Sequence, residues 1–240
     1  MRVVLIGYGK MGREIHRILV EQGCEVPLII DKDNSEMLCE ENLRGIDIAI
    51  EFSTPATALN NVRKCLENGV AVISGTTGWD VEAAKELCLE RGGKMLWASN
   101  FSIGVNILFA INKQLAHLMN QFGGYDVTLQ EVHHTAKLDA PSGTAVTLAE
   151  GILDNLDRKS SWVLGHTTVS DELGVAALRR SVVAGEHTVV WESAEDYIEL
   201  KHSAMGRVGF ASGAVVAAKF LSEQSAGIYT MNDIMGTSKN

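Results

Sequence analysis

The residues best suited to chemistry lie in one short run of the chain, residues 131–145. Within it, His133, His134 and Lys137 supply two imidazoles and an ammonium, which are groups that can donate protons near neutral pH. A Pro-Ser-Gly-Thr turn at 141–144 follows and has the composition of a helix start, whose free backbone N–H groups can bind a carboxylate. Proton donors beside such an anion-binding turn predict an enzyme that acts on an acidic small molecule.

The same run also has plainer interpretations. Adjacent residues of a strand point to opposite faces, so His133 and His134 cannot both face one cleft while the chain is extended, and one of them can be a core histidine. A metal site is disfavoured, because zinc-binding histidines are usually several residues apart and have Cys or carboxylate partners, a pattern that is not evident here. We expect no metal, and we expect Ser142 or Thr144 to cap the following helix.

A glycine motif near the start of the chain predicts a second binding site. The motif Gly-Tyr-Gly-Lys-Met-Gly at 7–12 follows an apolar run, 2–6, and opens a helical pattern that continues to about Gln22. In a strand–turn–helix of this kind the first glycine makes the tight turn, the second lets the backbone approach a pyrophosphate, and the third lets the helix pack on the strand. The context therefore predicts dinucleotide binding.

The end of the next expected strand, 26–30, bears on the choice of dinucleotide. It is followed by Asp31, 19 residues after Gly12, and a carboxylate there can accept hydrogen bonds from a ribose diol and favours NAD. Lys32 follows at once and can pair with the 2′-phosphate of NADP, although it can equally be a solvated surface lysine. The sequence permits NADH and NADPH and fixes neither.

Short strands alternate with helices through the first hundred residues. The expected strands are 46–50, 70–73 and 95–98, and the expected helices are 56–68 and 80–91. This alternation predicts an α/β fold with a Rossmann-like, doubly wound parallel sheet, in which ligands bind beyond the carboxyl ends of the strands. Two loops at those ends are candidate walls of a nicotinamide pocket; their residues are Gly75, Thr76, Thr77, Ala98, Ser99, Asn100 and Phe101.

The second half of the chain has a different pattern. We expect helices at 103–122, 144–156 and 208–223, a strand at 125–132, a polar irregular stretch at 157–174, and strands at 175–183, 187–193 and 197–202. Because these last strands follow one another without intervening helices, they predict a second α+β domain with a mostly antiparallel sheet.

Composition excludes several classes of function. The chain has 240 residues and a formal net charge of −9, which is unfavourable for broad binding to nucleic acid or to an anionic membrane. Its four cysteines form no CxxC pair, and neither a signal peptide nor an apolar run of membrane-spanning length is evident. We therefore expect a cytoplasmic protein with reduced thiols.

Taken together, these motifs resemble the dihydrodipicolinate reductase (4-hydroxy-tetrahydrodipicolinate reductase) family over nearly the whole chain. The most specific part is the run from His133 to Ala145, joined to the glycine motif. The other matching stretches are Glu51-Phe-Ser-Thr-Pro55, Gly75-Thr-Thr-Gly78, Asn100-Phe-Ser-Ile-Gly-Val-Asn106, Gly185-Glu-His187, Arg207-Val-Gly-Phe-Ala-Ser-Gly-Ala214 and Tyr229-Thr-Met-Asn-Asp-Ile-Met-Gly236.

The resemblance implies an enzyme of diaminopimelate and lysine biosynthesis that reduces 4-hydroxy-tetrahydrodipicolinate, or the dihydrodipicolinate formed from it, to tetrahydrodipicolinate with NADH or NADPH. It implies a dinucleotide-binding domain at 1–102, a substrate-binding and oligomerisation domain at 103–206 that forms a homotetramer through its sheet, and a return of 207–240 to the first domain. The only other partner that it implies is the small dicarboxylate substrate.

The resemblance also assigns roles to residues. His133 and Lys137 match the catalytic pair, and His134, Gly143 and Thr144 match substrate contacts. The residues that match the cofactor site are Gly7, Tyr8, Gly9, Lys10, Met11, Gly12, Asp31, Lys32, Gly75, Thr76, Thr77, Ala98, Ser99, Asn100 and Phe101. Lys32 stands where many relatives have arginine, the better phosphate fork, so the resemblance does not establish a strong preference for NADPH.

The reaction needs a hydride at the carbon β to an imine, followed by protonation. We assign the proton to Lys137, with His133 as the positioning group or alternative acid, and the grip on a substrate carboxylate to the amides of Ser142, Gly143 and Thr144 together with His134. The alternatives are another two-domain Rossmann dehydrogenase, which would not need the His-His-x-x-Lys run, and a non-catalytic dinucleotide sensor, which would not need the donors.

Overall fold

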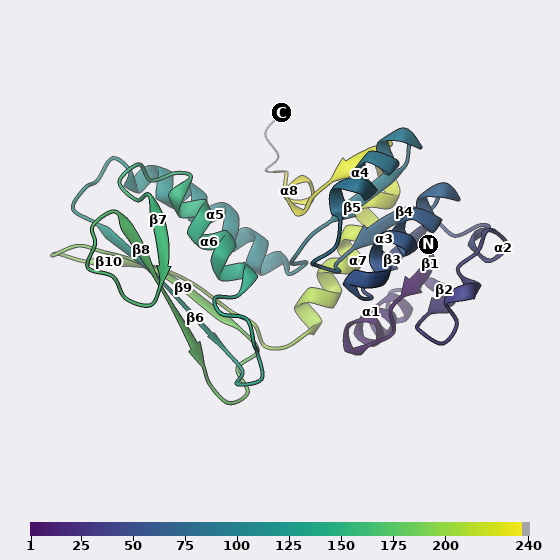
Figure 1. The fold of residues 1–240 in the computed structure, drawn as a ribbon, viewed down its shortest axis with the longest axis horizontal. Coiled ribbons are helices and arrows are strands. Elements are labelled where there is room, and N and C mark those ends of the chain that lie inside the picture. Colours follow the sequence, from purple (N-terminus) through teal and green to yellow (C-terminus); the bar gives the residue numbers. More distant parts are fainter. Residues whose placement is uncertain (237–240) are drawn as a thin grey trace. The chain divides into compact units, whose positions relative to one another are not determined.

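The chain forms two structural units in the computed structural model, which describes residues 1–236 (Figure 1). The first unit combines residues 1–103 with the described part of the chain from Arg207 onward. The second unit is residues 104–206. The first unit is therefore built from two stretches that are distant in sequence.

The first unit is organised around a six-stranded sheet in which every pairing is parallel. In spatial order its strands are β11 (Gly227–Tyr229), β5 (Lys94–Trp97), β4 (Ala71–Ser74), β3 (Ile48–Glu51), β1 (Arg2–Ile6) and β2 (Glu25–Ile30). The chain order reverses between β1 and β3, and in doubly wound sheets a ligand binds beyond the carboxyl ends of the strands at such a switch point. The glycine motif at 7–12 begins in the loop that leaves β1 there and runs into the helix that follows.

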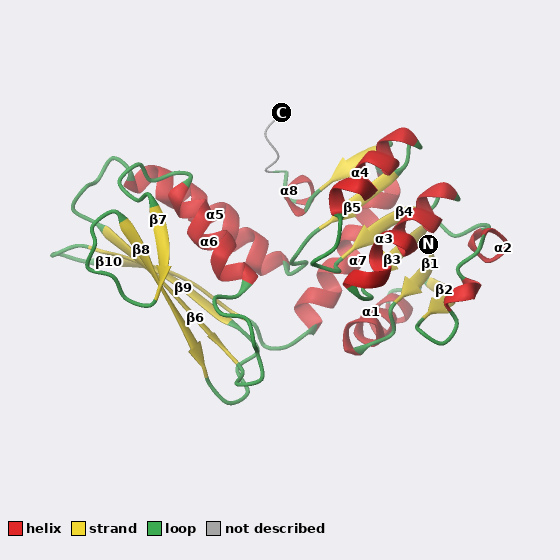
Figure 2. Ribbon diagram, viewed as in Figure 1, coloured by secondary structure: helices red, strands yellow, loops and turns green. Residues whose placement is uncertain are grey.

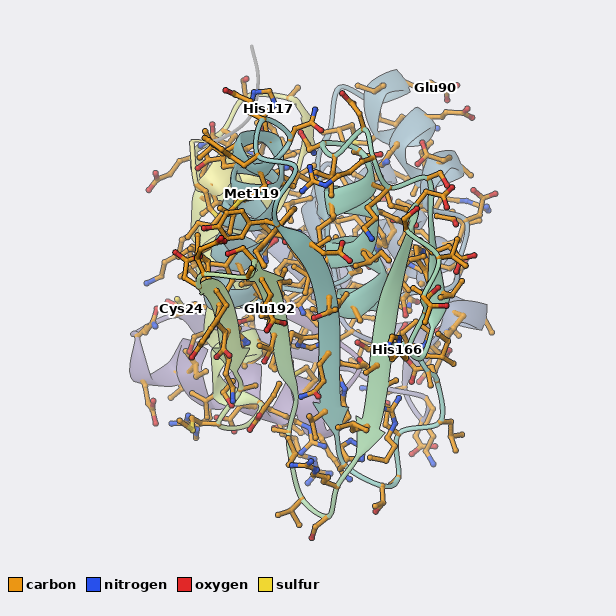
Figure 3. The ribbon with its side chains drawn as sticks, turned by 90° about the vertical axis from the view of Figure 1, so that its left-hand side faces the viewer. Cys24, Glu90, His117, Met119, His166 and Glu192 are labelled. Atoms are coloured by element: carbon orange, nitrogen blue, oxygen red, sulfur yellow. The ribbon has the colours of Figure 1, made fainter. Side chains whose placement is uncertain are left out.

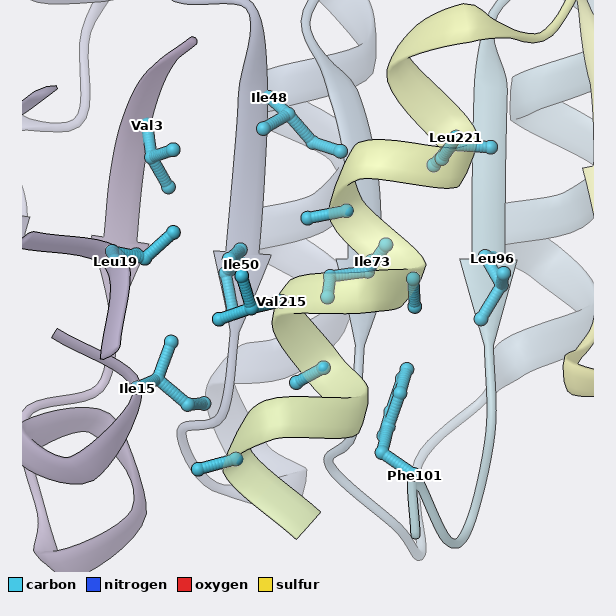
Figure 4. Packing of buried hydrophobic residues seen from close by; sticks show 14 of the residues in the cluster. Val3, Ile15, Leu19, Ile48, Ile50, Ile73, Leu96, Phe101, Val215 and Leu221 are labelled. Carbon is cyan, nitrogen blue, oxygen red and sulfur yellow. The ribbon is translucent and has the colours of Figure 1, made fainter. Parts of the chain in front are cut away.

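Helices cover both faces of this sheet, because the strands are apolar on both faces. α1 (Lys10–Glu21) and α7 (Val208–Glu223) pack on one face, where Val3, Ile50 and Leu221 belong to one buried cluster (Figure 4). α3 (Pro55–Glu67) and α4 (Val81–Glu90) contribute to the cluster on the other face. The shorter elements of the unit are the 3₁₀ turn η1 (Ser35–Met37), α2 (Glu40–Leu43) and α8 (Met231–Ile234).

One glycine sets how closely α7 approaches the sheet. A Cβ atom on Gly213 would collide with the carbonyl oxygen of Phe101, so the helix can lie against the loop after β5 only with glycine at this position. Much of the helix surface is small and buried, including Ala211, Ala214 and Ala218. The Gly/Ala-rich composition of α7 is thus a consequence of close packing.

The second unit pairs two helices with a five-stranded sheet (Figure 2). The helices are α5 (Ile103–Met119) and α6 (Gly143–Leu153), and the strands in spatial order are β10 (Tyr197–Ser203), β9 (Glu186–Glu192), β6 (Asp126–His133), β8 (Glu172–Arg179) and β7 (Ser161–Leu164). The sheet is mixed: the β10–β9 and β9–β6 pairs are antiparallel over seven residues each, and the β6–β8 and β8–β7 pairs are parallel over five and four.

The expected mostly antiparallel pairing is confirmed by those lengths, but the sequence analysis missed both parallel pairs. It was also wrong about residues 157–174, which were expected to be irregular and contain β7 and the start of β8. β7 is only four residues long and lies at the sheet edge, so it carries too short an alternation to be recognised. Its Trp162 nevertheless packs against the buried cluster of this unit.

The helices cover one face of the second sheet and leave the other open. Val127, Leu129 and Trp191 point to the helices and are almost completely buried, whereas Thr128 and Gln130, which alternate with them on β6, are exposed. Figure 3 shows the strands of this sheet with their side chains, among them Glu192 at the end of β9. Within residues 1–236, no helix combines the length and the apolar character needed to cross a membrane.

Candidate active site

The donor-rich run spans the end of β6, a loop and the start of α6. His133 is the last residue of β6 and is 8% exposed, and His134 is half-buried where the strand has ended. The loop continues to Ser142, whose side chain accepts a hydrogen bond from the amide of Ala145 and caps α6. Of the two residues expected to cap this helix, Ser142 is the one that does so.

Glu131, buried completely on β6, is the centre of a polar cluster that the sequence analysis did not identify. Its Oε2 atom lies 3.2 Å from Nδ1 of His133 and 3.7 Å from Nε2 of His187. Both carboxylate oxygens also accept from the amide of Ser142, at 3.1 Å each, and Oε1 accepts from the guanidinium of Arg179 at 3.2 Å. One carboxylate thus ties the strand, the helix cap and a neighbouring strand together.

This contact corrects the expected carboxylate grip. The amide of Ser142 was assigned to the substrate, but it donates to Glu131 and is not available for a ligand. Gly143 is exposed, and a Cβ atom there would meet nothing within 4 Å, so a ligand can approach its backbone closely. The anion-binding turn that the sequence predicts would therefore be centred on Gly143 and Thr144, in the first turn of α6, rather than on Ser142.

The strand register explains why the cluster forms. β9 runs antiparallel to β6 and places His187 directly opposite Glu131, and β8 runs parallel to β6 and places Arg179 opposite His133. Cross-strand partners on one face are close enough to interact through their side chains. The Nε2 atom of His187 also lies 3.1 Å from the hydroxyl of Ser142, and its ring packs edge-on against that of His133 at 5.1 Å.

Lys137 is held at the middle of the loop. Its ammonium lies 2.9 Å from the Oδ1 atom of Asp139, its side chain is 22% exposed, and its amide donates to the carbonyl of His134 at 3.1 Å. The residue after it, Leu138, is almost completely exposed. Lys137 is therefore a partly shielded ammonium in a loop that makes few apolar contacts of its own.

The electrostatics of the cluster separate the two candidate donors. Burial lowers the pKa of His133 to about 4; the charges of Lys137 and Arg179 act in the same direction, and Glu131 opposes them. Burial alone would raise the pKa of Glu131, but hydrogen bonds from His187 and Ser142 and the proximity of His133 lower it to about 2. At neutral pH the cluster therefore contains an ionised carboxylate and a neutral His133, which favours Lys137 as the proton donor.

These shifts predict acid destabilisation of the fold. The pKa of His133 falls from 6.5 to about 4 on folding, so between these values the unfolded chain binds more protons, and the free energy of unfolding decreases as the pH is lowered through this window. Glu131 acts in the same direction between 4.5 and about 2. We expect the contribution of His133 to lower the free energy of unfolding, measured in urea, by about 1–3 kcal/mol at pH 4.5 relative to pH 7. A His133→Asn variant that kept the full pH dependence of the wild type would contradict this assignment.

The same cluster also contains a possible metal-ligand set. Glu131, His133 and His187 each offer one atom of a metal-ligand type, and these three atoms lie within 4.8 Å of one another. The spacing of the three residues along the chain did not reveal this group. The carboxylate is, however, already paired with Arg179 and bonded to Ser142. The geometry therefore favours a closed hydrogen-bonded ion pair over a cation site.

The glycine motif in the first unit has the shape that a dinucleotide requires. Gly7 has φ +92°, in the region that favours glycine, and a Cβ atom on Gly12 would collide with the carbonyl oxygen of Gly7. A Cβ atom on Gly9 would instead meet nothing within 4 Å. The fold therefore requires glycine at positions 7 and 12, whereas the space next to Gly9 is open.

The helix that follows the motif can bind an anion. α1 has no side-chain cap at Gly9 and no acidic residue in its first turn, which begins with Lys10 and Met11, so its N-terminal dipole is not neutralised by the chain. The hydroxyl of Tyr8 bonds to Nδ1 of His16 at 2.7 Å, and its ring packs on the guanidinium of Arg13. The uncapped start of α1 therefore suits a pyrophosphate.

The acidic residue beyond β2 is exposed, as a ribose contact must be. The Oδ1 atom of Asp31 accepts from the amide of Lys32 at 3.0 Å, and the amide of Asp31 donates to the side chain of Asn34 at 2.7 Å. The side chain of Asn34 in turn donates to the carbonyl of Ile29. Asp31 and Lys32 are adjacent and both exposed, so the structure leaves the choice between NADH and NADPH open.

A second buried carboxylate, Glu51, organises the loops after β3 and β4. It accepts hydrogen bonds from the hydroxyls of Ser53, Ser74 and Thr76 and from the amide of Ser53. The carbonyl of Thr76 accepts from the indoles of Trp79 and Trp97, at 2.7 and 2.9 Å. Gly75 lies against the ring of Phe52, where a Cβ atom would collide, and Thr77 is exposed.

The four candidate cofactor residues in the loop after β5 differ in exposure. Ser99 is exposed and Asn100 half-buried, whereas Ala98 and Phe101 are buried at 9% and 2% exposure. The ring of Phe101 packs on Phe52 at 5.5 Å and belongs to the core, so only its backbone is suited to contacting a cofactor.

Sequence comparison decides the family. A profile described as "Dihydrodipicolinate reductase, N-terminus" matches residues 1–101, and one described as "Dihydrodipicolinate reductase, C-terminus" matches residues 104–235. The chain belongs to the dihydrodipicolinate reductase family. The 4-hydroxy-tetrahydrodipicolinate reductase of Christiangramia forsetii is 41% identical over 98% of both chains, and that of Chromobacterium violaceum is 35% identical over 98% of both chains.

The fold agrees with the family assignment. A dipicolinate-bound dihydrodipicolinate reductase from Paenisporosarcina sp. TG-14 superposes with a TM-score of 0.78, at 22% sequence identity, over 96% of this chain and 97% of that chain. The sequence analysis did not identify three polar residues that hold the loops of the candidate site: Glu51, Glu131 and Arg179. The local signals that could have identified the two glutamates are that Glu51 ends the apolar run 48–50 and that Glu131 continues the inward-facing alternation of Val127 and Leu129.

Proposed function

We propose that the chain reduces 4-hydroxy-tetrahydrodipicolinate, or the dihydrodipicolinate formed from it by loss of water, to tetrahydrodipicolinate with NADH or NADPH. The observation that carries the proposal is the loop between β6 and α6, which holds the ammonium of Lys137 beside Asp139 and leads into the open first turn of α6. That arrangement offers a proton donor and an anion-binding turn for a cyclic dicarboxylate. The family relatives at 41% and 35% identity support the same substrate class.

The first unit would hold the dinucleotide. The N-terminus of α1 and the open space over Gly9 suit the pyrophosphate, and Asp31 suits the ribose diol. The bound nicotinamide would supply a hydride. Lys32 keeps NADPH as well as NADH within the proposal, because its ammonium can balance a 2′-phosphate.

The second unit would bind the substrate and handle its proton. Gly143 and Thr144, at the N-terminus of α6, together with His134, would bind a carboxylate and fix the ring. When hydride reaches the carbon β to the imine, an electron pair moves onto the ring nitrogen and leaves an enamine that must be protonated. Lys137 would give that proton, and the neutral imidazole of His133 would help to position the substrate ring.

We also propose that the open face of the second sheet forms the contact between subunits of a homotetramer. The residues of this face alternate with the buried ones along β6 and β9; Val190 among them is half-buried, and the polar Thr128 and Gln130 are exposed. Light scattering of the purified chain would test this: a monomeric mass at micromolar concentration would contradict it.

The reductase proposal can be tested by absorbance at 340 nm. Purified protein is mixed with NADH or with NADPH, and the substrate is generated in the cuvette by the preceding synthase. We expect oxidation of the dinucleotide that depends on the synthase, with the ratio of kcat/KM for the two cofactors measuring what Asp31 and Lys32 leave undecided. Tight binding of either dinucleotide without any oxidation would contradict the proposal and favour a non-catalytic dinucleotide sensor.

A further inference from the structure

We propose that Arg179 and Glu131 act together as positioning residues that clamp the loop 134–142 and thereby place Lys137 and the N-terminus of α6 for the reaction. This inference rests on the proposed reductase function, because it concerns the same loop. Neither residue is assigned a contact with substrate or dinucleotide. Their role is carried out through the backbone of the loop.

The contacts of Arg179 reach the middle of the loop. Its Nε atom donates to the carbonyl of Lys137 at 3.3 Å, and its Nη2 atom donates to the carbonyl of Asp139. The same guanidinium donates to Oε1 of Glu131 through both terminal nitrogens at 3.2 Å. Arg179 therefore connects the backbone on both sides of Leu138 to the buried carboxylate on β6.

The contacts of Glu131 hold the two ends of the loop. At the start it lies 3.2 Å from the imidazole of His133, the last strand residue, and at the end it accepts the amide of Ser142, the cap of α6. Both ends and the middle of the loop are thus attached to one ion pair. The side chain of Glu131 is fully buried and that of Arg179 is 20% exposed, so water weakens these contacts little.

The loop has few other means of keeping its shape. Thr135, Ala136, Leu138, Asp139 and Ala140 are all exposed, and Leu138 is 96% exposed. A segment that buries little apolar surface opens readily unless polar contacts hold it. Because the chain between His134 and Pro141 contributes little to the core, its conformation depends on the ion pair beneath it.

The donors of Arg179 are already used, which distinguishes positioning from direct substrate binding. In addition to Glu131, Lys137 and Asp139, the guanidinium donates to the carbonyl of Leu178 at 2.8 Å. All three of its nitrogens have protein acceptors. A planar fork can satisfy several acceptors at fixed angles, whereas the single ammonium of a lysine cannot reproduce that geometry.

The test compares Arg179→Lys and Arg179→Ala with the wild type and with Arg180→Ala. Arg180 is the next residue and is exposed, so its variant removes the same charge from an adjacent position. We expect kcat to fall at least about tenfold in Arg179→Lys and about a hundredfold in Arg179→Ala. A displacement of the proton donor by about 1 Å can lower the rate about a hundredfold. The Kd for NADH should change less than about twofold in both variants, and the Arg180→Ala enzyme should match the wild type.

Two readouts separate positioning from simple loss of stability. Added guanidinium ion should restore at least about a tenth of the lost kcat in Arg179→Ala, since it can enter the vacated position and bond to the same acceptors. Amide hydrogen exchange of residues 134–142 should be at least about tenfold faster in Arg179→Lys than in wild type, while exchange in α5 is unchanged.

The exchange measurement keeps the inference testable independently of catalysis. If the wild-type chain fails to oxidise NADH or NADPH, the proposed function fails, but faster loop exchange in Arg179→Lys would still support the clamp. If Arg179→Ala does not fold, Arg179→Lys, which preserves the charge, carries the test. The inference would be overturned if residues 134–142 exchanged as slowly in Arg179→Lys as in the wild type, or if the kcat of Arg179→Lys equalled that of Arg180→Ala.

Discussion

A Lys137→Ala variant is expected to oxidise NADH or NADPH with kcat at least about a hundredfold below wild type, while its Kd for the dinucleotide stays within about twofold. The reason is the division of labour between the groups in the second unit. His133 is buried, and its pKa is lowered to about 4, so it is neutral at pH 7 and a poor source of protons. Lys137 carries an ammonium in the loop that leads into the proposed anion-binding turn, and its position is fixed by Asp139 and by the backbone contacts of its loop.

The measurement is a set of initial rates with synthase-generated substrate, together with dinucleotide titration followed by fluorescence. Lys219→Ala is a suitable control, because Lys219 is an exposed lysine of α7 in the first unit and its loss removes the same charge. We expect that control to match the wild type. A parallel fall of dinucleotide affinity and turnover in Lys137→Ala would show that Lys137 has a different role.

The first unit was largely predictable from local sequence. Each strand of its sheet before α5 is a short apolar run, and each is followed by a loop with Gly, Ser, Thr or Asp before the next helix. The glycine motif adds physical demands that structure bears out at Gly7 and Gly12, where positive φ and close packing require glycine. Local spacing sufficed because the signals and the elements that they predict lie within a few residues of one another.

The polar cluster of the second unit was not predictable in this way. Glu131 meets Arg179 and His187 because β8 and β9 pair with β6 in a particular register, and register is a property of the whole sheet. Nothing near Glu131 in the chain indicates which residues will lie opposite it. The same non-local cause explains why the amide of Ser142 was assigned to the substrate, although Glu131 occupies it.

Short edge elements were missed for a different reason. β7 has four residues and β11 has three, so each depends on pairing with a neighbouring strand rather than on its own pattern. β11 pairs with β5 and completes the first sheet from a stretch more than a hundred residues later. In β7 the one apolar anchor is Trp162, which is insufficient to define a period.

A Gly9→Val variant is expected to weaken dinucleotide binding about a hundredfold without destabilising the fold, whereas Gly12→Ala is expected to destabilise the fold itself. A Cβ atom on Gly9 meets nothing within 4 Å, and its backbone, at φ −75° and ψ −161°, suits any residue. The added side chain therefore obstructs only a ligand that approaches from outside, such as a pyrophosphate at the N-terminus of α1. The expected hundredfold rise in Kd corresponds to a loss of about 2.7 kcal/mol of binding free energy.

Gly12 presents the opposite case, because a Cβ atom there runs into the carbonyl oxygen of Gly7. The clash is with backbone, so the turn or the helix must move, at a cost of about 2 kcal/mol and a Tm lower by about 4–8 °C. Thermal unfolding and NADH titration of both variants separate the two demands on the motif. If Gly9→Val bound NADH as tightly as the wild type, the open space over Gly9 would not be the pyrophosphate site. If it bound weakly but also melted like Gly12→Ala, the space would be needed by the fold rather than by a ligand.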